Sequence, residues 1–138
     1  MALIIDLKPG EKILIGSAVI TNDKQRTRLH IAGDTPILRE KEIMKEEEAK
    51  SPCQKIYFMI QCMYISNDSK VYHNDYFEQV QEIQQAAPTL SFMFMTINEK
   101  IISGEYYKAM KDARELIKVE QELIASTIKN AKQIEKEE

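Results

Sequence analysis

The distribution of aromatic residues divides this chain into two parts of different character. All ten Tyr and Phe side chains lie between Tyr57 and Tyr107, and the first 43 residues carry none. Those 43 residues are rich in Ile and Leu and are interrupted by Gly and Pro, a composition typical of short strands and turns. The sequence therefore predicts an α+β protein, with a small antiparallel sheet at the N-terminus and helices after it.

Four strands are expected in the first part. The apolar run Ala2–Leu7 stops at Pro9-Gly10, a dipeptide suited to a turn, and Lys12–Thr21 resumes it, so these two strands are expected to form a hairpin. Polar and apolar residues alternate in Arg28–Ile31, which predicts a half-buried third strand. Pro36 opens a last short strand, at a position where a proline is tolerated.

A bundle of about four helices is expected to follow. Ser51 and Pro52 suit an N-cap and a first helical position, and the apolar segment Ile56–Ile65 is expected to be the buried centre of the second part, as a helix or as a buried strand. A fourth helix is expected after Gly104. Three stripes at helical spacing are Tyr72, Tyr76, Val80, Ile83 and Ala87; Leu90, Phe94, Ile97 and Ile101; and Tyr106, Ala109, Met110, Ala113, Ile117, Leu123, Ile124 and Ile128.

The chain is thus expected to consist of a β module at residues 1–45 and a helical domain at residues 51–138, with a charged connection at residues 41–50. The charged tail from Lys129 to Glu138 is expected to fray.

Charge is distributed unevenly between the two parts. Residues 1–45 carry eight Lys and Arg against six Asp and Glu, whereas residues 46–138 carry eleven against sixteen. This acidic excess argues against broad nonspecific binding to nucleic acid, but it leaves room for one local basic strip in the first part. The strip would consist of Lys8, Lys24, Arg26, Arg28 and Arg39.

Several classes of protein are disfavoured. Cys53 and Cys62 would face different ways on one helix, so a disulfide between them is not expected. The chain shows no secretory or membrane-spanning segment, which predicts a cytoplasmic protein without membrane contact. His30 and His73 are isolated, and no phosphate loop or catalytic triad stands out, so we expect a binding protein without metal or cofactor rather than an enzyme.

The lack of aromatic rings also limits how this sheet could bind RNA, because many single-strand readers stack bases on exposed rings. Arg, Lys, backbone groups and aliphatic strand edges would have to serve instead. In their order, Leu3-Ile4-Ile5, Ile13-Leu14-Ile15-Gly16 and Leu38-Arg39-Glu40 resemble the CsrA family of RNA-binding translational regulators. In that family the first and last strands of an interleaved dimer form the surface for GGA-containing leaders, which implies roles here for Ile5, Lys8, Leu38 and Arg39.

A homodimer through the β module also follows from the strands themselves, because a few short strands leave edges that a second copy could cover.

Four blocks spanning residues 1 to about 118 resemble the FlbT family, flagellar regulators of alphaproteobacteria. The resemblance implies a post-transcriptional regulator that acts on the 5′ leader of flagellin mRNA and changes its translation and decay, and it implies FlaF and flagellin as partners. The blocks are Ile4-Ile5-Asp6-Leu7-Lys8-Pro9-Gly10-Glu11, Ile37-Leu38-Arg39-Glu40-Lys41-Glu42-Ile43, Ile56-Tyr57-Phe58 with Gln61-Cys62, and Gly104-Glu105-Tyr106-Tyr107-Lys108-Ala109.

Two mechanisms stay open at this point. In the first, the β module binds the leader RNA, and the candidate RNA-binding residues are Ile5, Lys8, Lys24, Arg26, Arg28, Leu38 and Arg39. In the second, the helical domain is an adaptor that docks flagellin or FlaF, so that the effect on mRNA is indirect. The adaptor would use Met59, Met63, Met93 and Met95, unless these methionines are ordinary core residues.

Overall fold

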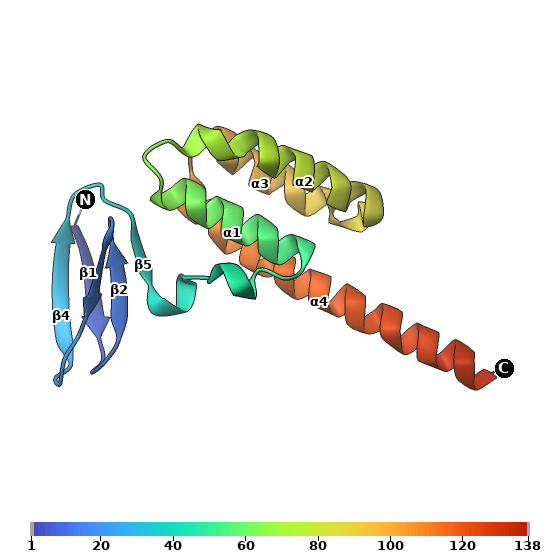
Figure 1. Cartoon of the computed structure of the whole chain (residues 1–138), viewed down its shortest axis with the longest axis horizontal. Coiled ribbons are helices and arrows are strands. Elements are labelled where there is room, and N and C mark those ends of the chain that lie inside the picture. The colour runs from blue at the N-terminus through green and yellow to red at the C-terminus, as the bar shows by residue number, and fades with distance from the viewer. Residues whose placement is uncertain (1, 138) are drawn as a thin grey trace. The chain divides into compact units, whose positions relative to one another are not determined.

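The chain folds as two compact units, Met1–Met44 and Lys45–Glu138, in a computed structural model that describes residues 2–137. Strands make up the first unit and four α-helices make up most of the second (Figure 1). The predicted α+β class, with antiparallel strands before a helical bundle, is confirmed.

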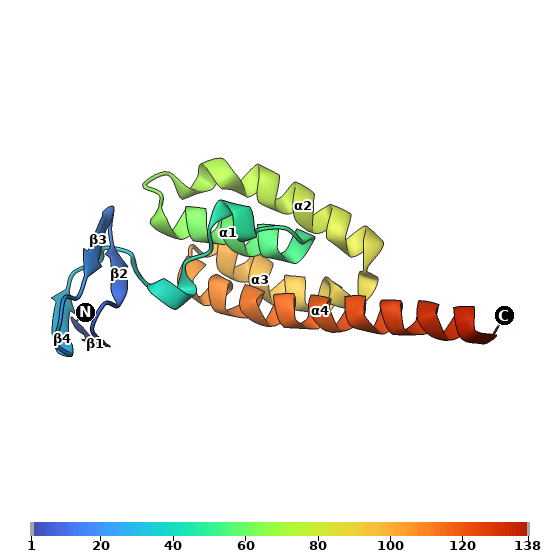
Figure 2. The same cartoon turned by 60° about the horizontal axis from the view of Figure 1, so that its bottom comes forward.

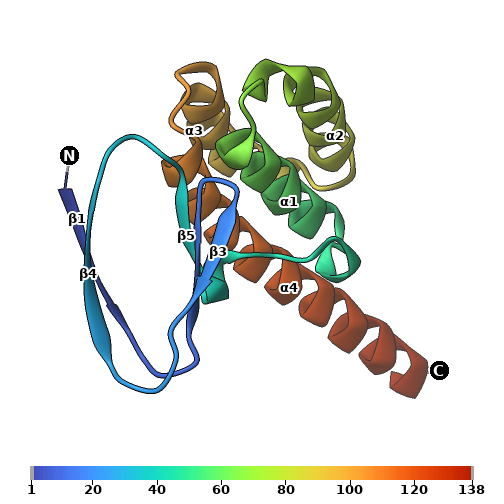
Figure 3. The same cartoon turned by 60° about the vertical axis from the view of Figure 1, so that its left-hand side comes forward.

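The β unit contains five antiparallel strands: β1 (Ala2–Leu7), β2 (Lys12–Ile15), β3 (Ala18–Thr21), β4 (Thr27–Ala32) and β5 (Ile37–Arg39). They form two sheets, a two-stranded one in the order β1-β4 and a three-stranded one in the order β3-β2-β5. Figure 3 shows the long pair β1 and β4 apart from the shorter strands. Each sheet therefore has two edge strands.

Two details of the predicted strand order are wrong. The expected hairpin between the first two strands does not form, because β1 pairs along its whole length with β4, from Ala2 opposite Ala32 to Leu7 opposite Thr27. β4 offers a partner of six residues, whereas β2 has four. The expected strand Lys12–Thr21 is itself a hairpin, in which Ile15 pairs with Ala18 and Gly16 takes a φ of +61°, a conformation that favours glycine.

The core of the β unit is small. Its buried cluster comprises Ile5, Leu7 and Ile13, with Ile15, Leu29, Ile31 and Ile37 packed partly buried against it. Apolar side chains remain exposed on both sheets, namely Leu3, Ile4, Val19 and Ile20. A module of this size buries little apolar area, so its packing alone stabilises it weakly.

The helical unit is built from α1 (Pro52–Ile65), α2 (His73–Ala86), α3 (Ser91–Ile102) and α4 (Tyr106–Glu137). The alternative of a buried strand at Ile56–Ile65 is therefore wrong. Ser51 caps α1 as predicted, because its Oγ accepts a hydrogen bond from Gln54 N at 3.1 Å and the Gln54 side chain accepts one from Ser51 N at 3.0 Å. No helix in residues 2–137 is long and apolar enough to span a membrane.

The predicted apolar stripes form the core of this unit. Their fully buried members include Tyr76, Phe94, Ile97 and Ile101. In α4 the predicted Ala109, Met110 and Ala113 are buried, whereas Leu123, Ile124 and Ile128 are exposed. Leu116, which the predicted stripe did not include, is fully buried, and the predicted Ile117 is half-buried. Figures 1 and 2 show that the C-terminal end of α4 extends beyond the other helices.

The tail after Lys129 was expected to fray, and this prediction is wrong: α4 is helical to Glu137. Residues 129–133 are exposed, and the Lys, Glu, Gln and Ala residues of the tail are good helix formers, which supports the helix there.

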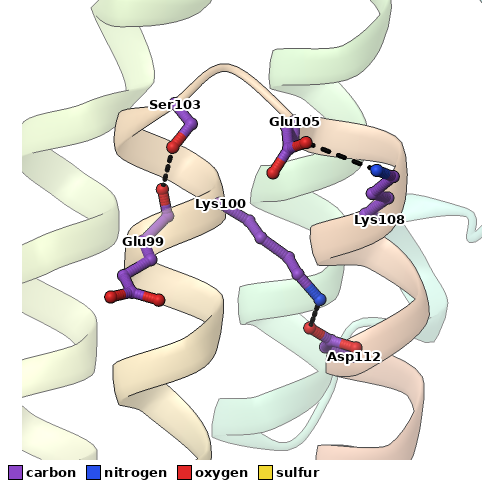
Figure 4. Close-up of polar contacts among 6 residues, drawn as sticks. All are labelled: Glu99, Lys100, Ser103, Glu105, Lys108 and Asp112. Carbon is purple, nitrogen blue, oxygen red and sulfur yellow. Dashed lines mark hydrogen bonds and ion pairs between the residues drawn. The ribbon is translucent and has the colours of Figure 1, made fainter.

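A glycine-terminated turn joins α3 to α4. Gly104 has a φ of +77°, Glu105 N donates to Lys100 O at 2.8 Å, and Gly104 N donates to Ile101 O at 3.2 Å, which is a Schellman motif. Figure 4 shows the polar contacts beside it, including the ion pair of Lys100 with Asp112 that joins the two helices. The predicted tight hairpin between these helices is confirmed.

A buried carboxylate fixes the start of α1 against α4. Glu120, which is 8% exposed, accepts hydrogen bonds from Ser51 Oγ at 2.5 Å and from Cys53 N at 3.0 Å. Burial raises the pKa of the Cys53 thiol, and the nearby Glu120 carboxylate raises it further. Cys53 is thus a neutral core residue.

Candidate nucleic-acid interface

A cleft of about 630 Å³ lies within the β unit, and all seven of its lining residues are charged. Four are cations and three are carboxylates: Lys8, Arg26, Arg39 and Lys41, with Asp6, Glu11 and Glu40. Such a lining disfavours apolar ligands and suits a ligand that carries anionic groups together with polar edges.

Asn22 joins the two turns that form one side of the cleft. Its Nδ2 lies 3.1 Å from Leu7 O, 3.0 Å from Lys8 O and 2.7 Å from Gln25 O. Backbone bonds reinforce this junction, with Gly10 N donating to Asn22 O and Asn22 N donating to Glu11 O, each at 2.9 Å. The turn that carries Lys8 is thereby held against the turn that carries Arg26.

The other side of the cleft is formed where β5 ends. Ile13 of β2 pairs with Arg39 in the sheet, which fixes the backbone of this arginine. After it the chain makes a 3-10 turn, Glu40–Glu42, and the Glu42 carboxylate accepts a hydrogen bond from Arg39 N at 2.9 Å. This turn places Lys41 beside Arg39 in the cleft lining.

The cations of the cleft differ from their neighbour Arg28 in how they are paired. Arg28 Nε lies 3.1 Å from Asp6 Oδ1 on the exposed surface of the β1–β4 pair. Within residues 2–137, Lys8, Arg26, Arg39 and Lys41 make no ion pair with a carboxylate within 4.0 Å. These four cations are therefore available to an anionic ligand.

The carboxylates of the cleft also differ from one another. Asp6 pairs with Arg28, and Glu40 Oε2 accepts a hydrogen bond from Lys12 N at 3.4 Å. Glu11 Oε1 is a buried oxygen without a hydrogen-bond partner among the described residues. A buried polar atom left in this state costs free energy unless a ligand or water satisfies it.

The seven residues predicted to bind RNA are only partly brought together. Lys8, Arg26 and Arg39 share the cleft, Arg28 is paired outside its lining, and Lys24 is exposed in the turn before β4. Ile5 and Leu38 are buried, with exposures of 3% and 0%, so their side chains support strands and do not meet a ligand.

Sequence reasoning did not identify Lys41, Glu11 or Asn22 as site residues. Lys41 lies two residues after Arg39, and this spacing could have identified it as a further cation of the site. The role of Asn22 depends on tertiary contacts that no local pattern reveals.

The helical unit offers apolar surfaces instead. Phe92, Met95 and Ile102 on α3 are 78%, 66% and 73% exposed, and beside them lies a groove of about 190 Å³ whose lining includes Met93 and Thr96. A second groove of about 350 Å³ lies along the exposed stripe of α4. Its lining consists of Pro52, Ile83, Ala86, Ala87, Leu90, Glu120, Leu123, Ile124, Thr127 and Ile128.

The four methionines named for an adaptor surface have different environments. Met63 is fully buried core, Met59 and Met93 are half-buried, and Met95 is exposed. Met93 and Met95 are therefore accessible on α3, and Met63 is not.

Comparison with known proteins identifies the family. The family model described as "Flagellar protein FlbT" matches residues 3–124. The chain belongs to the FlbT family. A FlbT relative from Bradyrhizobium diazoefficiens, named a probable flagellum biosynthesis repressor protein, is 45% identical over 89% of this chain and 85% of its own length.

Two further FlbT relatives support the assignment. The probable repressor protein of Rhodopseudomonas palustris is 42% identical over 91% of this chain and 99% of its own length. The flagellum biosynthesis repressor protein FlbT of Caulobacter vibrioides is 30% identical over 88% and 89%, respectively. No solved structure matches the chain.

Proposed function

We propose that this FlbT-family protein regulates flagellin synthesis by binding the 5′ leader of flagellin mRNA through the charged cleft of its β unit, thereby controlling translation and decay of the message. The observation that carries the proposal is the grouping of Lys8, Arg26, Arg39 and Lys41 without ion-pair partners among residues 2–137. The names of the relatives, which describe repressors of flagellum biosynthesis, support the flagellar part of it.

The four cations would contact the phosphate groups of single-stranded leader RNA. Phosphate contacts by Arg and Lys supply most of the affinity of such complexes, and Arg39 can bind a phosphate through two parallel hydrogen bonds. No aromatic residue lines the cleft, so base stacking does not contribute there. The protein would act as a binding protein without a cofactor, and the acidic helical unit would limit binding to other RNA.

The test is binding of the purified protein to a flagellin leader RNA and to a scrambled RNA of equal length. We expect tighter binding of the leader, and we expect Arg39→Ala and Lys8→Ala each to weaken it about tenfold through the loss of a charge-assisted contact. Arg28→Ala is the matched control, because it removes a cation already paired with Asp6, and it should change affinity by less than about threefold. Equal binding of leader and scrambled RNA would refute the proposal.

A second candidate function is favoured by the exposed apolar face of α3. Here the helical unit would act as an adaptor that docks flagellin or FlaF on Phe92, Met95 and Ile102, and its effect on mRNA would be indirect. Apolar side chains grouped on one helix face are a common docking surface for a partner helix.

This adaptor function predicts complexes that survive nuclease treatment. We expect FlaF or flagellin to co-purify with the protein, and Phe92→Asp to abolish the complex while leaving leader RNA binding unchanged. A nuclease-treated sample that retains neither partner would exclude the adaptor function.

We also propose that two copies pair through the β unit. Each of its sheets has two edge strands, and Leu3, Ile4, Val19 and Ile20 are exposed apolar side chains that a second copy would cover. Light scattering should give twice the chain mass, and Val19→Asp should shift it toward the monomer. A monomeric wild-type mass at the concentration used for RNA binding would contradict this arrangement.

A further inference from the structure

Glu11 occupies an unusual place in a cleft proposed to bind RNA. Its backbone is fixed on both sides, because Glu11 N donates to Lys8 O at 3.0 Å and Glu11 O accepts from Asn22 N at 2.9 Å. Its side chain lines the cleft, yet its buried Oε1 has no partner among the described residues. The cleft lining therefore includes a carboxylate that has one oxygen without a partner among the described residues, on a residue whose backbone is fixed, beside four cations.

A phosphate cannot satisfy this oxygen, because a carboxylate only accepts hydrogen bonds and repels a second anion. A nucleotide also carries donors, however, on the edge of its base. The exocyclic amino groups of cytosine, adenine and guanine can each donate to a carboxylate. Uracil has no amino group, and its single ring N–H lies between two carbonyl oxygens that a carboxylate would repel.

We propose that Glu11 is a specificity-determining residue that accepts a hydrogen bond from the exocyclic amino group of an unpaired base, so that the cleft prefers amino-bearing bases and rejects uracil. This inference rests on the proposed RNA binding and assigns a separate role within it. The cations hold the phosphate groups of any sequence, whereas Glu11 selects the base. In the other two carboxylates of the cleft one oxygen has a partner, because Asp6 Oδ1 pairs with Arg28 and Glu40 Oε2 accepts a hydrogen bond from Lys12 N.

The experiment compares binding of the full-length protein to oligo(C), oligo(A) and oligo(U) of twelve nucleotides at pH 7.5 and one salt concentration. Cytosine and uracil have rings of the same size. They differ in the group that would meet the carboxylate, because cytosine carries an amino group where uracil carries a carbonyl oxygen. We expect oligo(C) and oligo(A) to bind about tenfold more tightly than oligo(U), the discrimination typical of one well-placed contact to a base.

Three variants separate base selection from charge. Glu11→Gln should bring the oligo(C) to oligo(U) ratio within twofold, because an amide can donate to a uracil carbonyl as well as accept from an amino group. Glu40→Gln removes the same charge from the same cleft and should leave the ratio at about tenfold. Lys8→Ala should weaken binding of all three oligonucleotides equally.

Equal affinity of the wild type for oligo(C) and oligo(U), or a ratio that Glu11→Gln leaves unchanged, would overturn the role of Glu11 and leave the proposed RNA binding intact. Failure to bind any oligonucleotide and the leader RNA would overturn both.

Discussion

The two units of this protein differ in what their side chains contribute. Among the residues whose side chains are described, sixteen buried apolar residues lie in the helical unit and four in the β unit. The β unit instead collects seven charged residues around one cleft, four of them cations without ion-pair partners among residues 2–137. The comparison indicates that the helical unit is stabilised by packing, whereas the β unit combines a small core with a charged cleft.

The largest expected effect concerns the helical core. Phe94 is fully buried, so Phe94→Ala should lower the free energy of unfolding by about 3–5 kcal/mol, measured by urea titration. Phe92→Ala is the matched control on the same helix, and with 78% exposure it should change stability by less than about 0.5 kcal/mol. Similar losses from the two variants would mean that α3 does not pack as described.

A smaller effect is expected at the buried carboxylate that joins α1 to α4. Glu120→Ala removes the acceptor for Ser51 Oγ and Cys53 N, and leaving a buried donor unsatisfied costs about 1–3 kcal/mol. Thermal unfolding of this variant should be compared with that of Glu122→Ala, an exposed residue on the same helix. If the two variants melt together, Glu120 does not hold the start of α1.

In the β unit, Asn22→Ala should affect stability and binding together. The amide contacts three carbonyl oxygens, and its loss should cost about 1–2 kcal/mol and separate Lys8 from Arg26. Leader RNA affinity should therefore fall at least as much as in Lys8→Ala, although Asn22 does not line the cleft. A variant that is destabilised but binds RNA normally would show that the cleft does not depend on this junction.

The smallest effect is a dependence of stability on alkaline pH in the helical unit. Burial, assisted by Glu120, raises the pKa of Cys53 in the folded state, and burial, assisted by Glu46, raises that of Cys62. The unfolded chain therefore loses these protons first, and stability should fall as the pH rises above about 9. Urea titrations at pH 8 and 10 should show a lower free energy of unfolding at pH 10, and Cys53→Ala should make this difference smaller. An equal difference in the wild type and in Cys53→Ala would contradict the burial of this thiol.

The same contrast explains what the sequence could predict. Spacings of three and four residues depend on local helix geometry, so Tyr76, Val80 and Ile83 were correctly placed in the core. Strand pairing joins segments far apart in the chain, and the apolar run of β1 does not reveal that β4 rather than β2 is its partner. The helical unit was therefore predicted more accurately than the sheet.

The candidate site was predicted in its residue types but not in its arrangement. Lys8, Arg26 and Arg39 were identified as cations of the first part, but their convergence depends on the Asn22 junction and on the pairing of β2 with β5. Glu11 escaped notice because a carboxylate beside Lys12 resembles an ordinary surface residue. Only the tertiary structure shows that its Oε1 lacks a partner among the described residues.

The central claim, that the β unit and not the helical unit contacts RNA phosphates, is tested most directly by the salt dependence of leader RNA binding. Each phosphate contact to single-stranded RNA contributes about 0.7 to the slope of log affinity against log salt concentration. The double variant Lys8→Ala/Arg39→Ala should lower this slope by about 1.4. Lys108→Ala/Lys118→Ala, which removes two exposed cations of α4, should leave it unchanged. Equal slopes for the wild type and the cleft variant, or a fall in the α4 variant alone, would contradict the account.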